Sequence, residues 1–267
     1  MREKLANSRW SAATLVVLVA IAFASPARAA DFALQGSSVS PAKAFFAAPE
    51  GVRISFRFDA ADPRAVTIRI AGAAGEVRAY ELPALAPGAH ELSWDGLTAA
   101  GKAAPDGQYR VLIGEEGGPL STAGSVTLYG YRYPLRARHS FRGPVGEFGA
   151  GRSGGRIHEG FDVNAACGKP LFAVRGGTVI RRRFHPRLDG NFVVIRGSGE
   201  VRTYRYSHLA SPSPLRRGER VRTGDVVGRV GRTGNARSVG CHLHFEIRAG
   251  RRFIDPEPHL RRWDRYS

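Results

Sequence analysis

Histidine and acidic side chains in the second half of the chain are spaced as metal ligands could be. His158 and Asp162 lie four residues apart with Gly160 between them, and His242 and His244 alternate with apolar residues. In a strand, the histidines at 242 and 244 would project from one face, with their backbones roughly 6 to 7 Å apart. Imidazole nitrogens and carboxylate oxygens are common metal ligands. The pattern therefore predicts a metal site built on strands.

The first of these pairs requires a bend in the chain. A straight strand would separate His158 from Asp162 by roughly 13 Å, whereas each ligand of one zinc ion lies about 2 Å from it. Gly160 is the residue between them that could permit the bend. The pair differs from the helical zinc-protease motif because Asp162 stands where that motif has its second histidine.

A third segment with a candidate side chain is 204–209, which reads Tyr-Arg-Tyr-Ser-His-Leu. As a strand, it is expected to place Tyr206 and His208 on one face. His208 is therefore a further candidate for the site.

Strands are also the elements predicted to precede this region. Apolar and polar residues alternate in 52–58 and 66–70, and again in 109–113 after a turn signal at 105–107. This period of two is typical of strands with one buried face, and strands at this spacing indicate a β-sandwich. With 33 glycines and 16 prolines, the composition also argues against a helical bundle. The chain is therefore predicted to be mostly β.

Charge divides the chain into two halves. Residues 30–135 carry nine basic and eleven acidic side chains, whereas residues 136–267 carry 27 basic and 11 acidic ones, a net charge of +16. A field of this sign favours an anionic partner, such as a wall polymer or an anionic membrane surface. Arginine supplies 26 of those 27 basic side chains, a bias that the base composition of the genome could equally produce.

Residues 1–29 have the pattern of a cleaved export signal. Arg2, Lys4 and Arg9 precede an apolar run at 12–23, and small residues follow at 27–29, as signal peptidase requires. A membrane anchor is the alternative, but a span needs roughly 20 apolar residues. We therefore expect an extracytoplasmic protein, in the periplasm, the cell wall or the medium, that does not bind nucleic acid.

The first half also carries a family resemblance. The stretches Leu-Ser-Trp-Asp-Gly at 92–96 and Pro-Asp-Gly-Gln-Tyr-Arg-Val at 105–111 resemble the Ig-like domain of the flagellar hook-cap protein. The resemblance implies an Ig-like β-sandwich with a role in packing or positioning rather than in chemistry.

The segment from about His139 to Leu260 resembles the lysostaphin-type (LytM-like) zinc endopeptidases of bacterial cell walls. The matching pieces are 158–162, 168–173, 177–179, 190–195, 206–209, 218–234 and 242–246. This resemblance implies an antiparallel β-sheet peptidase domain that acts on peptidoglycan.

Roles follow from the resemblance for five residues. His158, Asp162 and His244 would bind one zinc ion per chain and leave a coordination position open for water, as a catalytic zinc site requires. His242 would be the general base, and His208 would orient water or stabilise the transition state. The other histidines are expected to have no catalytic role: His90, His139, His185 and His259.

The chain has two cysteines, Cys167 and Cys241. An isolated pair in an exported protein favours a disulfide, and zinc ligation is the alternative. Cys167 follows Asp162 by five residues and Cys241 precedes His242, so two segments that both flank the zinc should lie close together. The bond would then clamp the two ligand-bearing segments.

These observations predict a domain order and a function. The expected parts are a signal peptide at 1–29, an Ig-like domain at 30–135, a Gly/Arg-rich connector at 136–156, a zinc metallopeptidase domain at 157–260 and a tail at 261–267. The expected function is hydrolysis of peptide bonds in peptidoglycan cross-links or stems. The alternatives are a catalytically silent wall-binding activator of cell-wall amidases and an exported peptidase that acts on proteins. The first domain is expected either to position the enzyme or to occlude its zinc site.

Overall fold

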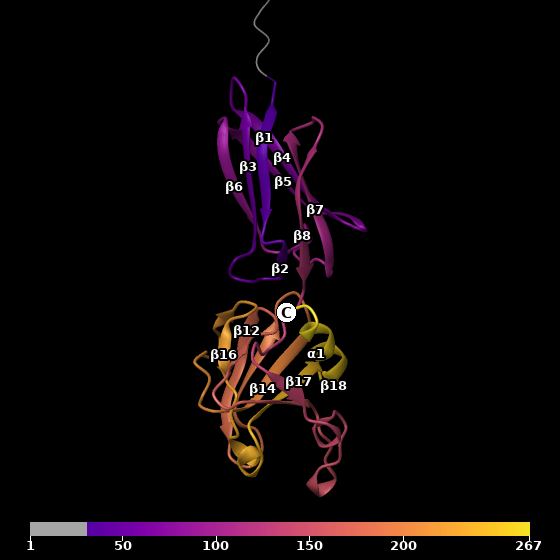
Figure 1. Cartoon of the computed structure of the whole chain (residues 1–267), viewed down its shortest axis with the longest axis vertical. Coiled ribbons are helices and arrows are strands. Elements are labelled where there is room, and N and C mark those ends of the chain that lie inside the picture. The colour runs from indigo at the N-terminus through magenta and orange to yellow at the C-terminus, as the bar shows by residue number, and fades with distance from the viewer. Residues whose placement is uncertain (1–30) are drawn as a thin grey trace, which may run out of the picture.

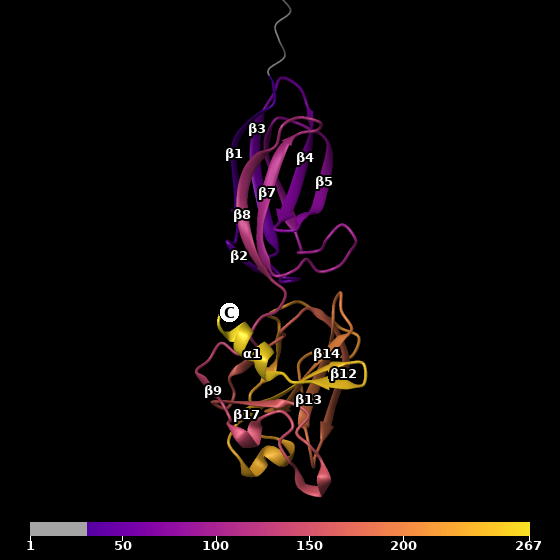
Figure 2. The same ribbon diagram turned by 90° about the vertical axis from the view of Figure 1, so that its right-hand side faces the viewer.

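The computed structural model describes residues 31–267, and the predicted signal peptide lies outside them. Strands dominate this part of the chain and form two domains stacked end to end, as Figure 1 and Figure 2 show. No helix within residues 31–267 combines the length and the apolar character needed to cross a membrane. The mostly β fold that the sequence predicted is confirmed.

The first domain is a sandwich of two sheets. One sheet has the order β1-β3-β6, and the other has the order β2-β8-β7-β4-β5, in which only the β2/β8 pair is parallel. The strands are β1 (Ala33–Ser40), β2 (Lys43–Phe45), β3 (Val52–Asp59), β4 (Arg64–Gly72), β5 (Gly75–Leu85), β6 (Gly88–Trp94), β7 (Gly107–Glu115) and β8 (Ser121–Tyr129).

The core of this sandwich follows the alternation in the sequence. Every second residue of β3, from Val52 to Phe58, is buried, and the residues between them face outward. The predicted alternation in β4 and β7 is likewise the alternation of buried residues that packs the two sheets together. Burial of these side chains supplies the main stabilisation of the sandwich, because each apolar group removed from water favours the folded state.

The second domain is built on one antiparallel sheet. The strands and helices are β9 (His139–Phe141), β10 (Phe161–Ala165), β11 (Pro170–Phe172), β12 (Gly177–His185), β13 (Gly190–Gly197), β14 (Arg202–Leu209), β15 (Arg220–Val221), β16 (Val226–Arg229), β17 (His242–Ala249), β18 (Arg252–Ile254), α1 (Glu257–Asp264) and the 3₁₀ helices at Pro144–Gly146, Ser153–Gly155 and Gly234–Ser238. The strand order is β15-β12-β13-β14-β17-β10-β9, with β18 paired to β17 and a separate β11/β16 pair.

The second domain extends beyond the expected segment 157–260 at both ends. The strand β9 lies within the expected connector, and it pairs with β10 through Val163 and Phe141. Helix α1 runs to Asp264 and buries Leu260 and Trp263 in the core of the same domain. Both additions cover apolar surface of the sheet, which would otherwise be exposed to water.

The two domains meet at a polar junction. The backbone N–H of Thr223 donates to the Ala47 carbonyl at 3.0 Å, and the Thr223 hydroxyl donates to the Phe46 carbonyl. Arg175, which is 3% exposed, donates to the Gly130 carbonyl at 2.9 Å and lies 4.3 Å from the centre of the Phe46 ring. Separating the domains would exchange these hydrogen bonds for bonds to water and expose the Phe46 ring that packs on Arg175, at a net free-energy cost. The junction therefore fixes how the first domain is placed on the second.

Candidate metal centre and active-site groove

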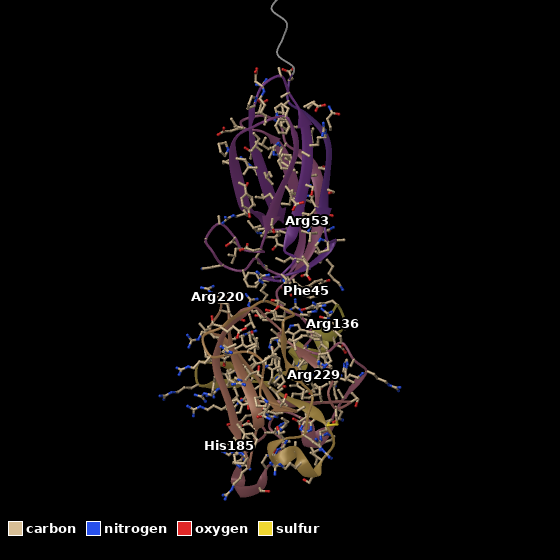
Figure 3. All side chains as sticks on the ribbon, turned by 90° about the vertical axis from the view of Figure 1, so that its left-hand side faces the viewer. Phe45, Arg53, Arg136, His185, Arg220 and Arg229 are labelled. Carbon is tan, nitrogen blue, oxygen red and sulfur yellow. A yellow bond between two sulfur atoms is a disulfide. The ribbon has the colours of Figure 1, made fainter. Side chains whose placement is uncertain are left out.

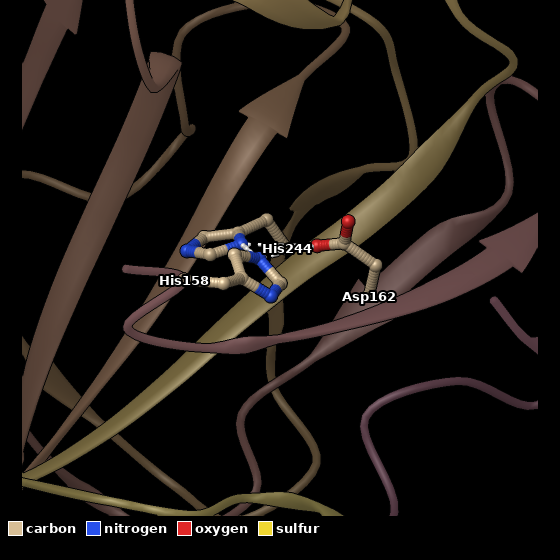
Figure 4. A group of neighbouring side chains, drawn as sticks. All are labelled: His158, Asp162 and His244. Atoms are coloured by element: carbon tan, nitrogen blue, oxygen red, sulfur yellow. Dashed lines mark hydrogen bonds and ion pairs between the residues drawn. The ribbon is translucent and has the colours of Figure 1, made fainter. Parts of the chain in front are cut away.

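Three predicted ligands converge in the second domain. His158 Nε2 lies 2.8 Å from His244 Nδ1 and 3.2 Å from Asp162 Oδ1, and His244 Nδ1 lies 3.0 Å from the same carboxylate oxygen. Figure 4 shows the three side chains pointing toward one another. Each residue is 9% exposed or less. The structure therefore brings two imidazoles and one carboxylate together in a buried cluster.

The sheet places two of these residues by register. Asp162 on β10 is directly opposite His244 on β17. Their neighbours Phe161, Val163 and Phe245 point to the other face and are buried in the core. Because side chains alternate along a strand, the same pairing that buries the apolar residues also sets the two polar ones side by side.

His158 reaches the cluster through the bend before β10. Its Nδ1–H donates to the Glu147 carbonyl at 2.8 Å, which turns Nε2 toward the other ligands. Gly160 lies in the bend, and a Cβ placed there would come within 2.5 Å of the Phe245 carbonyl oxygen and 2.7 Å of the His244 ring. Glycine is thus required at 160 by the closeness of β17 rather than by an unusual φ angle.

The donor atoms fit a tetrahedral divalent metal. Tetrahedral ligands about 2.0–2.1 Å from a zinc ion lie about 3.3 Å from one another, and the donor atoms here are 2.8 to 3.2 Å apart. A small outward shift of the side chains would therefore admit an ion. A cation would also compensate for the burial of an ionised carboxylate, which is otherwise costly.

The electrostatics of the cluster suit a cation. Burial raises the pKa of Asp162, but its contacts with the imidazoles of His158 and His244 outweigh this effect and hold the pKa well below its usual range. Burial lowers the pKa of His244, but its contacts with Asp162 and Glu246 outweigh burial and raise the pKa to about 9. Asp162 therefore stays ionised, and its negative charge, together with that of Glu246, favours positive charge at the cluster.

Glu246 supports the cluster from behind, a role that the sequence reasoning missed. Its carboxylate lies 3.2 Å from His244 Nε2 and 3.3 Å from the Arg205 guanidinium, which lies 3.5 Å from Asp189. A histidine that binds metal through one nitrogen commonly donates its other N–H to a carboxylate, which fixes the ring. The signal was present in the sequence, because 242, 244 and 246 alternate on one strand face.

We expect the substitution Glu246→Gln to weaken metal binding by roughly 10- to 100-fold, because loss of an outer carboxylate partner usually has an effect of this size. The amide also places an N–H₂ group near Arg205, where a negative charge stood. Competition with a chelator measures the affinity. The matched control is Glu116→Gln, at an exposed position in the first domain. Equal zinc affinity in both variants would contradict the supporting role.

Two further histidines flank the cluster without joining it. His242 Nε2 lies 3.8 Å from Asp162 Oδ2. Its Nδ1 lies 2.9 Å from the Gly240 carbonyl, to which it donates in the Nδ1–H tautomer, and 3.2 Å from the Arg142 guanidinium. His208 Nδ1–H donates to the Thr233 carbonyl at 2.9 Å, and its ring lies 4.8 Å from that of His242. In each case the backbone contact leaves Nε2 free to accept a hydrogen bond or a proton.

Burial lowers the pKa of both flanking histidines. For His208, burial and the nearby charge of His244 lower the pKa to about 3. For His242, burial is again the largest cause of the lowered pKa. Both imidazoles are therefore neutral at neutral pH. His242 can act as a proton acceptor beside the three predicted ligands, whereas the very low pKa of His208 suits it to accept hydrogen bonds rather than to take up a proton.

One expectation about this region is wrong. Tyr206 and His208 do not share a face of β14: the Tyr206 ring is buried in the core and its hydroxyl accepts a hydrogen bond from the Val174 N–H, whereas His208 lines the groove. The reason is the backbone of His208, whose φ of 60° lies in the left-handed region. Such a residue interrupts the alternation of a strand, and here it turns His208 toward the cluster of His158, Asp162 and His244.

The cluster lies at the bottom of a groove of about 350 Å³. One wall is formed by 142–159 and the other by residues near Asp189 and by the 3₁₀ helix Gly234–Ser238. No residue of the first domain lines this groove, and Figure 1 places segment 142–157 (pink) at the end of the second domain away from the sandwich. The remaining histidines, at 90, 139, 185 and 259, also lie outside it.

A disulfide joins Cys167 and Cys241, and the described part of the chain has no free cysteine. Cys241 directly precedes His242, and the Cys241 carbonyl accepts a hydrogen bond from the Ala165 N–H at the end of β10. The bond therefore ties the strand that carries Asp162 to the strand that carries His242 and His244.

We expect a variant with both cysteines replaced by serine to be less stable by about 4 kcal/mol, because the bond closes a loop of roughly 75 residues in the unfolded chain. Urea unfolding of the second domain measures the difference. Dithiothreitol should lower the wild type to the level of the variant and leave the variant unchanged. An unfolding midpoint that is the same for wild type and variant would refute this expectation.

Known proteins match both domains. Residues 156–256 match the model of Peptidase family M23, and residues 47–118 match that of the FlgD Ig-like domain. The L-Ala--D-Glu endopeptidase of Bacillus subtilis (strain 168) is 34% identical over 149 residues, which cover 52% of this chain and 45% of the relative. The DD-carboxypeptidase/endopeptidase Mpg of Neisseria meningitidis serogroup B (strain ATCC 13091 / M2091) is 40% identical over 101 residues, which cover 38% of this chain and 22% of the relative.

The matches thus span less than half the length of these two relatives. Among solved structures, the catalytic domain of lysostaphin from Staphylococcus simulans is 26% identical and has a TM-score of 0.40, over 47% of this chain and 92% of that one.

Proposed function

Because residues 156–256 form a domain of peptidase family M23 that follows an Ig-like domain of the FlgD type, we propose that this chain is a zinc-dependent endopeptidase. Its proposed substrates are peptide bonds in the cross-links or stems of peptidoglycan. The observation that carries the proposal is the buried convergence of His158, Asp162 and His244 beside two further histidines, His208 and His242, that lie outside this cluster. The names of the two relatives, both peptidases, support the same reaction.

His158, Asp162 and His244 are the residues proposed to hold one zinc ion. When bound, zinc acts as a Lewis acid that lowers the pKa of water to about 7 and polarises a carbonyl group. Glu246 keeps the His244 ring in the orientation in which Nδ1 faces the other donors. The backbone carbonyl of Glu147 does the same for His158.

His242 is proposed to be the general base. With its Nδ1–H held by the Gly240 carbonyl, its Nε2 is free to take a proton from the attacking water and then deliver it to the leaving amine. His208 lies on the same side of the three residues and is proposed to orient that water by accepting a hydrogen bond from it through Nε2.

The first domain is proposed to position the enzyme rather than to block it. Its contacts reach the second domain through Thr223 and Arg175 at the junction, and none of its residues enters the groove. Peptidoglycan lies outside the cytoplasmic membrane, so the proposed activity places the chain there, in line with the predicted signal at 1–29. Exposed arginines at 181–183 on β12 would favour approach to an anionic wall polymer or membrane surface.

Two other functions would use the same surface differently. A silent activator of amidases would bind the wall without needing metal ligands, and the intact donor set argues against it. A peptidase that acts on proteins would use the same residues to cut a polypeptide substrate.

Digestion of purified peptidoglycan tests the proposal. We expect zinc-loaded protein to release peptides cut within stems or cross-links, identified by chromatography and mass spectrometry. A chelator should abolish this release, and added zinc should restore it. If peptides detach from sugars only when a separate amidase is added, the activator function is favoured. If casein is cut and peptidoglycan is not, the protein peptidase is favoured.

A further inference from the structure

The groove carries more positive charge than the metal site explains. Three arginines line the wall formed by 142–159, namely Arg142, Arg152 and Arg156. Within residues 31–267, none of these three has a carboxylate oxygen within 4.0 Å. Arginines without carboxylate partners beside a reaction centre are suited to bind an anionic group of a ligand.

The acidic residues of the groove do not balance these arginines. Asp162 belongs to the proposed metal centre, and Asp189 and Glu246 are engaged with Arg205. Only Glu159, which is exposed, is left. Three guanidinium groups therefore face one free carboxylate, and a divalent ion at the ligands would add to the positive field.

Local contacts hold two of the arginines in place. Arg152 donates to the Val145 carbonyl at 2.8 Å and to the Gly151 carbonyl at 3.3 Å through its two terminal nitrogens, each of which keeps a second N–H. Arg156 Nε donates to the Ser153 carbonyl at 3.3 Å. A guanidinium has five N–H donors, so the terminal nitrogens of Arg156 remain available. They form the planar pair that binds a carboxylate with two parallel hydrogen bonds.

The position of these arginines limits where the anionic group can be. Arg156 is two residues from the ligand His158, and the Arg142 guanidinium lies 3.2 Å from His242 Nδ1. The same wall exposes two apolar side chains, Val145 at 63% and Ile157 at 58%. Together they offer a cationic and apolar surface directly beside the reacting atoms.

We propose that this wall is a subsite for a free carboxylate within one or two residues of the bond that is cut. The inference rests on the proposed endopeptidase function and narrows its substrates to peptides with an unamidated acid next to the scissile bond. Arg152 and Arg156 bind the acid, and Arg142 adds to the positive field at the base. Peptides in which that acid is a carboxamide are cut more slowly because a neutral amide forms weaker hydrogen bonds with guanidinium groups.

The test compares two forms of one substrate. Cross-linked stem-peptide dimers are used with their carboxylates free, or with the same carboxylates converted to carboxamides, and kcat/KM is measured for each. We expect the wild type to prefer the acid form by roughly 10- to 100-fold. In the double variant Arg152→Gln/Arg156→Gln, the ratio of acid to amide rates should fall to about one, chiefly through a higher KM for the acid.

The matched control is Arg220→Gln, an exposed arginine on β15 that lies near the junction with the first domain in Figure 3. Its acid-to-amide ratio should equal that of the wild type. Equal rates of the wild type on both forms, or an equal loss on both forms in the double variant, would overturn the subsite while leaving the endopeptidase function in place. If folded, zinc-loaded protein cut neither form, both the subsite and the endopeptidase function would be overturned.

Discussion

Replacing His244 by alanine is expected to remove the metal and with it the activity. His244 is the central residue of the cluster proposed to bind zinc, within 3.0 Å of both other donor groups. Without its ring, two protein donors remain, and the Glu246 carboxylate loses its imidazole partner in a buried site. The loss of zinc affinity should exceed the roughly 10- to 100-fold effect of an outer partner. Metal analysis of the purified variant and digestion of peptidoglycan measure the two effects.

The control for this variant is His185→Ala, because His185 is an exposed histidine at the end of β12 and is not a ligand. It should keep about one zinc ion per chain and the wild-type rate. Thermal unfolding of both variants separates loss of metal from loss of the fold. A His244→Ala protein that is folded and holds zinc as the wild type does would refute the ligand assignment.

Replacing His242 by alanine is expected to give the second large effect, with a different signature. His242 lies beside the ligands but is 3.8 Å from the nearest Asp162 oxygen, so zinc content should be unchanged. The loss of a positioned proton acceptor should lower kcat by about 10²- to 10⁴-fold. The value of KM should change little, because the imidazole is proposed to act on water rather than on the bound peptide.

Two measurements are needed on the His242→Ala protein, namely its zinc content and its rate on peptidoglycan. A variant that loses zinc would make His242 a ligand instead of a base. A variant with full zinc and a wild-type rate would remove His242 from the chemistry altogether. The two histidine variants, at 242 and 244, thus divide the site into a residue that moves protons and a residue that holds the metal.

Much of the fold could be predicted because the signal is local. Alternation in 52–58 predicted β3, and the same period in 242–246 predicted a strand that presents histidines on one face and apolar residues on the other. Side-chain direction in a strand depends only on counting residues. Residue type likewise identifies which groups can bind a metal.

Other features depend on segments that are far apart in the chain. Asp162 and His244 are 82 residues apart and become neighbours only through the register of β10 with β17. Glu246 gains a function only because β14 brings Arg205 beside it. The left-handed backbone of His208 reversed the expected face, since counting by two does not detect a single residue with positive φ.

The sequence by itself determined the types of residue, the strands and the candidate ligands, because propensity and period are properties of short segments. The tertiary structure alone decided the arginine-lined wall, the support behind His244 and the attachment of the first domain at the end away from the groove. Each of these depends on how distant segments pack, and packing is selected by the burial and pairing of the whole chain rather than by any local pattern.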